Sequence, residues 1–275
     1  MVKLAYADAV DAVTLLALRM AFSLPFFLAA AVLTGRDQHS QPLTFRDKWA
    51  LIILGLIGYY LASLLDFLGL QYISAGLERM ILFLYPTMVV LISALFFRQK
   101  VGRTAWLALL ISYAGIALVY WHDMRILQHD VLTGALLVFG SALAYAIYLV
   151  GAGQNVVRIG ATRFTAYVMI VACVACLVQF AVTHPLTDLK LPVKIYVLAA
   201  AMALFSTVLP AFLLAAAMHR IGSMRTSLIG SVGPVSTICL AYVFLGEPLS
   251  AVQVAGSILV LTGVLMISLK QHVQR

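Results

Sequence analysis

The sequence predicts an all-α protein that crosses a membrane many times, and three observations lead to this fold class. Of its 275 residues, 64% are hydrophobic and only 10% are charged, whereas a soluble domain carries roughly 25% charged residues. Apolar runs of about 20 residues, the length of a membrane-spanning helix, recur along the chain. Positive charge gathers in alternate loops between these runs. We therefore expect most of the surface to face lipid.

Nine apolar runs are long enough to cross a bilayer, with end positions uncertain by about 2–4 residues. Short loops separate them, so we expect no separate soluble domain and expect the functional residues to lie within or between helices. The predicted spans are Val10–Leu33, Trp49–Leu70, Ala75–Phe97, Arg103–Tyr120, Leu132–Gly151, Phe164–Val182, Ile195–Met218, Ser223–Leu245 and Ala251–Leu269.

The distribution of basic residues supports this span count and predicts the orientation. Nine spans place 12 of the 18 Lys and Arg residues on the side of the C-terminus and 4 on the other side, while Arg19 and Arg79 fall inside spans. Basic residues collect in cytoplasmic loops. The C-terminus is therefore predicted to be cytoplasmic and the N-terminus external. The basic residues are scattered singly rather than along one stripe, so we do not expect nucleic-acid binding.

The two halves of the chain repeat one pattern at a fixed distance. Three pairs of landmarks lie 148 residues apart: Pro86 with Pro234, Phe96 with Phe244, and Gly115 with Gly263. Five spans follow about Asp130 but only four precede it. We therefore expect two repeats, residues 1–121 and 130–270, the first of which lacks its first helix. A repeat with an odd number of helices gives the inverted arrangement of many secondary transporters.

Small residues recur seven positions apart in the last span of each half. Ala108 and Gly115 share one helix face, and so do Gly256 and Gly263. This spacing predicts a seam where helices approach closely. The alternative is that glycine is simply common in membrane helices.

Specific motifs resemble those of EamA-type members of the drug/metabolite transporter superfamily. The motifs are Ser74-Ala75-Gly76-Leu77 through Tyr85-Pro86, Ile221-Gly222-Ser223 through Gly233-Pro234, and Phe244-Leu245-Gly246-Glu247-Pro248-Leu249-Ser250. The resemblance implies ten helices in two five-helix repeats, of which this chain holds about nine. It also implies a carrier in the bacterial cytoplasmic (inner) membrane that moves small metabolites or amino acids, with export favoured.

Away from the span ends, four charged residues fall well inside predicted spans, where charge is costly and marks functional or paired groups: Arg19, Asp66, Glu78 and Arg79. Asp66 and Arg79 stand at similar distances from a helical turn near Tyr72, so we expect them to pair. The pair either lines a substrate cavity or locks the helices together. Their equivalents in the second half, Leu214 and Ser227, are uncharged. A pair that only locked helices together would be expected in both halves, so this difference favours a role in the substrate cavity.

Further polar groups within the spans are candidate cavity liners, because small-molecule sites combine aromatic walls with a few polar groups. For the tyrosines the alternative is a role as interfacial anchors. Two prolines that are repeat mates are candidate hinges, with static curvature as the alternative. The candidate liners are Tyr59, Tyr60, Tyr85, Tyr145, Tyr148, Gln179 and Tyr242, and the candidate hinges are Pro86 and Pro234.

The sequence predicts no cofactor, metal site or catalytic residue. Cys173 and Cys176 form a C-x-x-C inside an apolar run without further ligands nearby in sequence, so we interpret them as small apolar residues. We expect a secondary transporter that works by alternating access as a monomer or homodimer, with a small-molecule substrate and the lipid bilayer as its partners. An integral-membrane lipid-modifying enzyme is the alternative.

Overall fold

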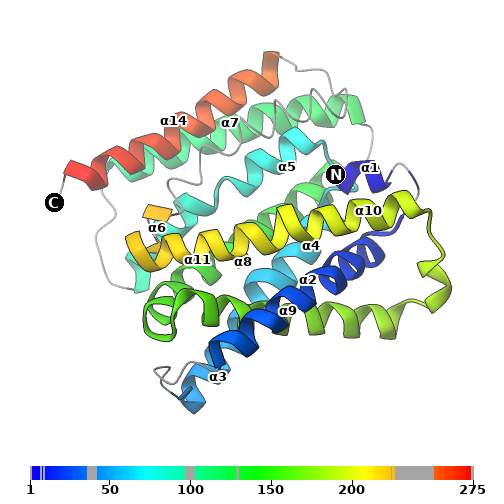
Figure 1. Cartoon of the computed structure of the whole chain (residues 1–275). Coiled ribbons are helices and arrows are strands. Elements are labelled where there is room, and N and C mark those ends of the chain that lie inside the picture. Colours follow the sequence, from blue (N-terminus) through cyan, green and yellow to red (C-terminus); the bar gives the residue numbers. More distant parts are fainter. Residues whose placement is uncertain are drawn as a thin grey trace. The chain divides into compact units, whose positions relative to one another are not determined.

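The computed structural model of the chain describes residues 2–6, 8, 10–35, 42–96, 103–127, 130–223, 225–226 and 251–273. Every regular element within these ranges is a helix, as the sequence predicts (Figure 1). Among the described residues, six helical stretches are long and apolar enough to cross a membrane, and two shorter apolar helices, Leu110–Trp121 and Val254–Gly263, accompany them. The prediction of an all-α polytopic membrane protein is confirmed.

The helices of the first half follow one another through short turns. They are α1 (Val2–Tyr6), α2 (Ala12–Gly35), α3 (Phe45–Gly55), the π-helical η1 (Leu56–Leu61), α4 (Ala62–Gly69), α5 (Ala75–Leu82), α6 (Tyr85–Phe96) and α7 (Arg103–Leu127). Those described in the second half are α8 (Val131–Ile159), α9 (Ala161–Thr183), the short 3-10 helix η2 (Leu186–Leu189), α10 (Val193–Ala201), the π-helical η3 (Met202–Val208), α11 (Leu209–Ile221) and α14 (Ala251–Val273).

Most predicted spans coincide with described helical segments. Two differ, one because its helix is longer than predicted and one because it is divided. The predicted span Leu132–Gly151 continues as α8 to Ile159, with the Asn155 side chain donating to the Gly151 carbonyl at 2.8 Å. The predicted span Ala75–Phe97 is divided into α5 and α6. The predicted span Ser223–Leu245 lies almost entirely outside the described residues.

Pro86 explains the division between α5 and α6. Proline has no N–H group, so nothing at position 86 can donate to the Leu82 carbonyl, and its ring crowds the carbonyl of the preceding turn. α5 accordingly ends at Leu82, and α6 begins at Tyr85. Thr87 Oγ1 donates to the Leu84 carbonyl at 2.7 Å. The proline therefore stands just behind an interruption of the span rather than within a continuous helix.

Helices of the two halves correspond at the spacing that the sequence landmarks predict. α2 begins at Ala12 and its counterpart α9 at Ala161, while α7 begins at Arg103 and its counterpart α14 at Ala251. The π-helical segments η1 and η3 recur at nearly the same spacing, each in the middle of a long span. A π-helical turn is rare and often marks a functional position. The correspondence between the halves therefore extends to fine backbone detail.

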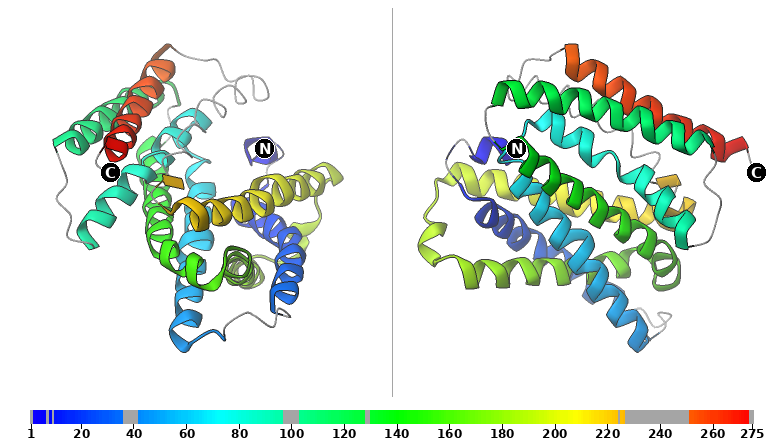
Figure 2. Two further views of the ribbon diagram at one scale, coloured as in Figure 1. Left: turned by 60° about the vertical axis from the view of Figure 1, so that its left-hand side comes forward. Right: turned by 180° about the vertical axis from the view of Figure 1, so that it is seen from behind.

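The described chain forms two compact units, each of which draws helices from both halves. Unit 1 comprises Met1–Phe67 and Gly151–Ser223, and unit 2 comprises Leu68–Val150 and Met224–Arg275. In unit 1, α2 packs along α9, and in unit 2, α7 packs along α14 (Figures 1 and 2). Each of these pairs consists of repeat mates.

The mates in unit 1 run antiparallel. At one end His184 Nε2, directly after α9, lies 3.2 Å from Asp11 Oδ2, directly before α2. Further along, Val13 and Ala17 pack with Phe180, and Met20 Sδ lies 3.7 Å from Cys173 Sγ. Residue numbers rise in α2 as they fall in α9, which is the direction that an inverted repeat requires of equivalent helices.

The mates in unit 2 meet through small residues and also run antiparallel. Ser112 Oγ lies 3.5 Å from the carbonyl of Val260, its own equivalent in the second half. A Cβ atom at Gly115 would lie 2.6 Å from the Gly256 carbonyl oxygen, and one at Gly256 would lie 2.8 Å from the Gly115 carbonyl oxygen. The predicted seam of small residues is therefore a real close approach of two backbones.

Gly256→Leu should weaken this seam, because its side chain would overlap the α7 backbone and force the helices apart. We expect destabilisation of about 1–3 kcal/mol, the usual cost of overpacking. The measurement is the midpoint of thermal unfolding of the purified protein in detergent.

Gly35→Leu is the matched control, since a Cβ at Gly35 has no atom within 4 Å. Equal midpoints for Gly256→Leu and Gly35→Leu would show that the glycine contact does not contribute to stability.

Candidate functional site

A buried guanidinium marks the candidate site in unit 1. Arg19 stands seven residues into α2, about 10 Å from the helix start at 1.5 Å per residue, and is 8% exposed. Its Cζ lies 4.6 Å from the centroid of the Phe67 ring, within cation–π range. Arg19 Nε is buried and has no hydrogen-bond partner in the described part of the chain. A cation placed in this way is costly in a membrane and is a functional-site hypothesis by default.

Asp66 provides the negative charge beside Arg19. It lies in α4, next to Phe67, and it interacts electrostatically with the Arg19 guanidinium. Arg19 and Asp66 were both selected from the sequence as charges inside spans, and the structure brings them to the same place in unit 1. Opposite charges in a low-dielectric interior stabilise each other's ionised forms.

α1 closes this cluster from outside the spanning segments. The Tyr6 hydroxyl donates to the Phe67 carbonyl at 2.7 Å. Burial, followed by the negative charges of Asp66 and Asp11, raises the pKa of Tyr6 above its usual value. The phenol therefore stays protonated and keeps its hydrogen bond to the end of α4. This contact ties α1 to the segment that carries Asp66.

The predicted pairing of Asp66 with Arg79 stays a prediction, because Asp66 belongs to unit 1 and Arg79 to unit 2. Within unit 2, Arg79 Nε lies 3.1 Å from Glu78 Oε2. Glu78 is buried, whereas the Arg79 side chain is 40% exposed. The two adjacent charges of α5 thus form an ion pair with each other.

Three of the predicted aromatic liners come together in unit 2. The Tyr85 and Tyr145 rings are 5.2 Å apart in an edge-on arrangement, and the Tyr145 and Tyr148 rings stack at 5.9 Å. Tyr148 is fully buried in α8. The structure therefore brings these three rings together, and their role as cavity liners stays a prediction.

The other predicted liners are less closely grouped. Tyr59 and Tyr60 are half-buried and lie in η1. Gln179 lies in α9, and its Oε1 is buried without a hydrogen-bond partner among the described residues. Tyr242 and Pro234 lie outside the described residues.

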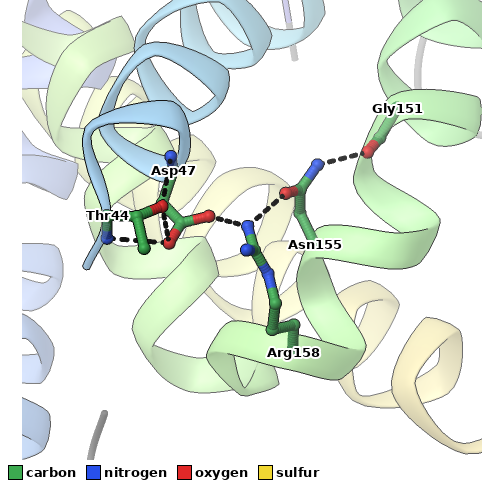
Figure 3. A network of polar contacts seen from close by, with 5 residues as sticks. All are labelled: Thr44, Asp47, Gly151, Asn155 and Arg158. Atoms are coloured by element: carbon green, nitrogen blue, oxygen red, sulfur yellow. Dashed lines mark hydrogen bonds and ion pairs between the residues drawn. The ribbon is translucent and has the colours of Figure 1, made fainter. Parts of the chain in front are cut away.

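A polar network that the sequence analysis missed joins α3 to the end of α8 (Figure 3). Thr44 and Asp47 form a capping box at the start of α3: the Thr44 N–H donates to Asp47 Oδ2 at 2.9 Å, and the Asp47 N–H donates to Thr44 Oγ1 at 3.3 Å. Asp47 is buried and also forms an ion pair with Arg158 of α8. Arg158 Nη2 donates to Asn155 Oδ1 at 3.4 Å.

The sequence contains a signal for one part of this network, the capping box at the start of α3. Thr44-Phe45-Arg46-Asp47 precedes an apolar run and has the spacing of a capping box. Its partner Arg158 follows much later in the chain, so no local pattern could have assigned it to Asp47. This network fixes where two spans meet at the predicted cytoplasmic end of unit 1.

Comparison with known proteins places the chain in a family. The model of the EamA-like transporter family matches residues 1–121 and 132–269. The chain belongs to the EamA-like transporter family. The family and the apolar helices together show a multi-pass membrane protein and a membrane transporter.

Two relatives carry transporter names. This EamA-like transporter is 33% identical over 216 residues to YcbK of Bacillus subtilis (strain 168), an uncharacterized transporter, in an alignment that covers 76% of this chain and 69% of that protein. It is 28% identical over 221 residues to YyaM of the same organism, also an uncharacterized transporter, with 79% and 72% covered.

The fold is shared with a protein of known crystal structure. The TM-score is 0.70 at 16% sequence identity, and the superposition covers 97% of this chain and 91% of that one. At this identity the likeness concerns the fold of the EamA-like transporter alone.

Arg158→Gln should destabilise the EamA-like transporter, because it leaves the buried Asp47 carboxylate without its counter-charge. We expect about 1–3 kcal/mol, less than the roughly 3–5 kcal/mol of a fully buried pair, since half of the Arg158 side chain is exposed. The thermal midpoint in detergent measures the loss.

A double-mutant cycle separates the ion pair from the capping box. Asp47→Asn together with Arg158→Gln should be less destabilised than the sum of the single changes, and Arg220→Gln, at an exposed arginine of α11, should have little effect. Strict additivity would contradict an energetic link between Asp47 and Arg158.

Proposed function

We propose that this EamA-like transporter is a secondary carrier that moves small metabolites or amino acids across the bacterial cytoplasmic membrane by alternating access, with export as its direction. The observation that carries the proposal is the buried Arg19 beside Asp66. A fixed cation and a fixed anion inside the spanning helices give complementary contacts for a solute that is itself charged. Arg19 suits a substrate carboxylate, and Asp66 suits a substrate amine or a coupling proton.

The antiparallel mates support alternating access. In transporters built from inverted repeats, the substrate site lies near the bilayer midplane, and one set of helices moves against the other. Here α2 with α9 and α7 with α14 give two pairs of equivalent helices that run in opposite directions. Pro86 and Pro234 serve as the hinges in this proposal, and the break between α5 and α6 lies directly before Pro86.

Ion gradients supply the energy in this proposal. The sequence contains no G-x-x-x-x-G-K-[ST] nucleotide-binding loop. The distribution of basic residues supports a cytoplasmic C-terminus in this proposal. The carrier is proposed to work as a monomer or homodimer, with the bilayer and a small-molecule substrate as its partners. Membership of a transporter family favours this function over the alternative of a lipid-modifying membrane enzyme.

Reconstitution in liposomes tests the proposal directly. The protein is incorporated with a panel of labelled amino acids and small organic acids, with and without a pH gradient. We expect saturable counterflow of at least one solute, accelerated by the gradient. Asp66→Asn should retain counterflow and lose the acceleration, because the amide cannot carry a proton.

Asp188→Asn, in the 3-10 helix η2, none of whose residues is buried, is the control and should behave as the wild type. Absence of saturable counterflow for every solute would contradict the carrier. A gradient response that persists in Asp66→Asn would contradict coupling through Asp66 alone.

A further inference from the structure

Three sulfur atoms are buried together where α2 packs on α9. Cys173 and Cys176 stand three residues apart in α9, so they share one helix face, and Met20 of α2 lies against Cys173. All three side chains are fully buried, and both cysteines are free thiols. The C-x-x-C that the sequence presents without further ligands thus gains a third sulfur from a helix in the other half of the chain.

The distances fit a soft metal ion. Cys173 Sγ lies 3.7 Å from Met20 Sδ. Sulfur ligands at about 2.3 Å from a metal in a trigonal arrangement lie about 4 Å from each other. Thiolate and thioether ligands select Cu(I) over the harder divalent ions. The two helices therefore already hold two of the three sulfurs near their coordinating separation.

The charge of the surroundings also fits. Two thiolates and one Cu(I) ion form a complex of net charge −1, which would be costly in a membrane interior without a counter-charge. Arg19 interacts electrostatically with both Cys176 and Cys173. Its Nε is buried with no hydrogen-bond partner among the described residues. The positive charge of Arg19, which directly precedes Met20 in α2, would offset the negative charge of the complex.

We propose that Cys173, Cys176 and Met20 form a binding site for a single Cu(I) ion. Binding releases the two thiol protons and forms two copper–thiolate bonds and one copper–thioether bond, with no change of oxidation state. A site of this kind would join α2 to α9 beside the Arg19–Asp66 pair. The copper complex would neutralise Arg19, the cation that the proposed function assigns to a substrate carboxylate. Copper would therefore compete with such a solute.

The surroundings favour a monovalent ion of low coordination number over zinc. Zinc takes four ligands in structural sites, and no group of three His, Cys, Asp or Glu side chains that could hold a metal occurs in the part of the chain that the structure describes. Two thiolates and a thioether suffice for Cu(I).

Equilibrium competition for copper tests the site without any transport measurement, so its outcome is separate from that of the carrier proposal. The purified, reduced full-length protein is titrated with Cu(I) under anaerobic conditions against bicinchoninate, a coloured chelator. We expect about one Cu(I) per chain. The apparent affinity should rise by up to about a hundredfold per pH unit, because two protons leave on binding.

Variants assign the ligands. Cys173→Ser and Cys176→Ser should each lower the affinity for Cu(I) by at least tenfold. Met20→Leu keeps the volume of the side chain and should lower it about tenfold, which separates ligand loss from misfolding. Cys239→Ser removes the third cysteine of the chain and should bind copper as the wild type does.

X-ray absorption of the copper-loaded wild type provides the second readout. We expect a first shell of sulfur alone at about 2.3 Å. A shell of nitrogen or oxygen, the absence of binding in competition with bicinchoninate, or wild-type affinity in Met20→Leu and both serine variants would each overturn the proposed site.

Discussion

The antiparallel packing of sequence-equivalent helices is the constraint on which the rest of the structure depends. Within a bilayer no hydrophobic force draws helices together, so close packing, small residues and polar contacts decide which helices meet. Gly115 and Gly256 let the backbones of α7 and α14 approach closely. α2 and α9 meet through Val13, Ala17 and Phe180. The contact between the buried sulfur atoms of Met20 and Cys173 depends on how α2 is aligned along α9.

The helices recur in both halves of the chain, but the charged residues Arg19 and Asp66 do not. Arg19 and Asp66 have Tyr167 and Leu214 as their equivalents in the second half. A charge pair that served only to hold a repeated fold together would be expected in both halves, yet the second half provides an aromatic and an aliphatic side chain instead. The symmetric helices therefore supply the framework, and Arg19 and Asp66 supply the chemical selectivity that we propose for transport.

The sequence was sufficient to predict the fold because span length, apolar character and the repeat can all be recognised without knowing which helices contact each other. Length and apolar character define a span, and the evenly offset landmarks of the two halves define the repeat, so α2, α9, α7 and α14 were all expected. The break before Pro86 needed only the missing N–H of proline, although the sequence analysis placed that proline within one continuous span. The π-helical segments η1 and η3 have no comparable signal.

The site was less predictable because its contacts join distant segments. Arg19 and Asp66 were each selected because a charge inside a predicted span is conspicuous, but no local pattern links residues so far apart in the sequence, and the expected pair of Asp66 with Arg79 stays a prediction. The Asp47–Arg158 contact depends on how α3 meets the end of α8. The position of Met20 opposite Cys173 likewise follows from the register of α2 on α9. Such registers are properties of packing and cannot be derived from one segment.

Equilibrium binding of the solute that shows counterflow tests the central claim, that Arg19 holds the transported molecule. The measurement compares the wild type, Arg19→Gln and the exposed control Arg220→Gln in detergent, each checked for its thermal midpoint. Loss of a charge-assisted contact in a buried site predicts an affinity at least about tenfold weaker in Arg19→Gln, with the control unchanged. Wild-type affinity in a folded Arg19→Gln protein would contradict the account.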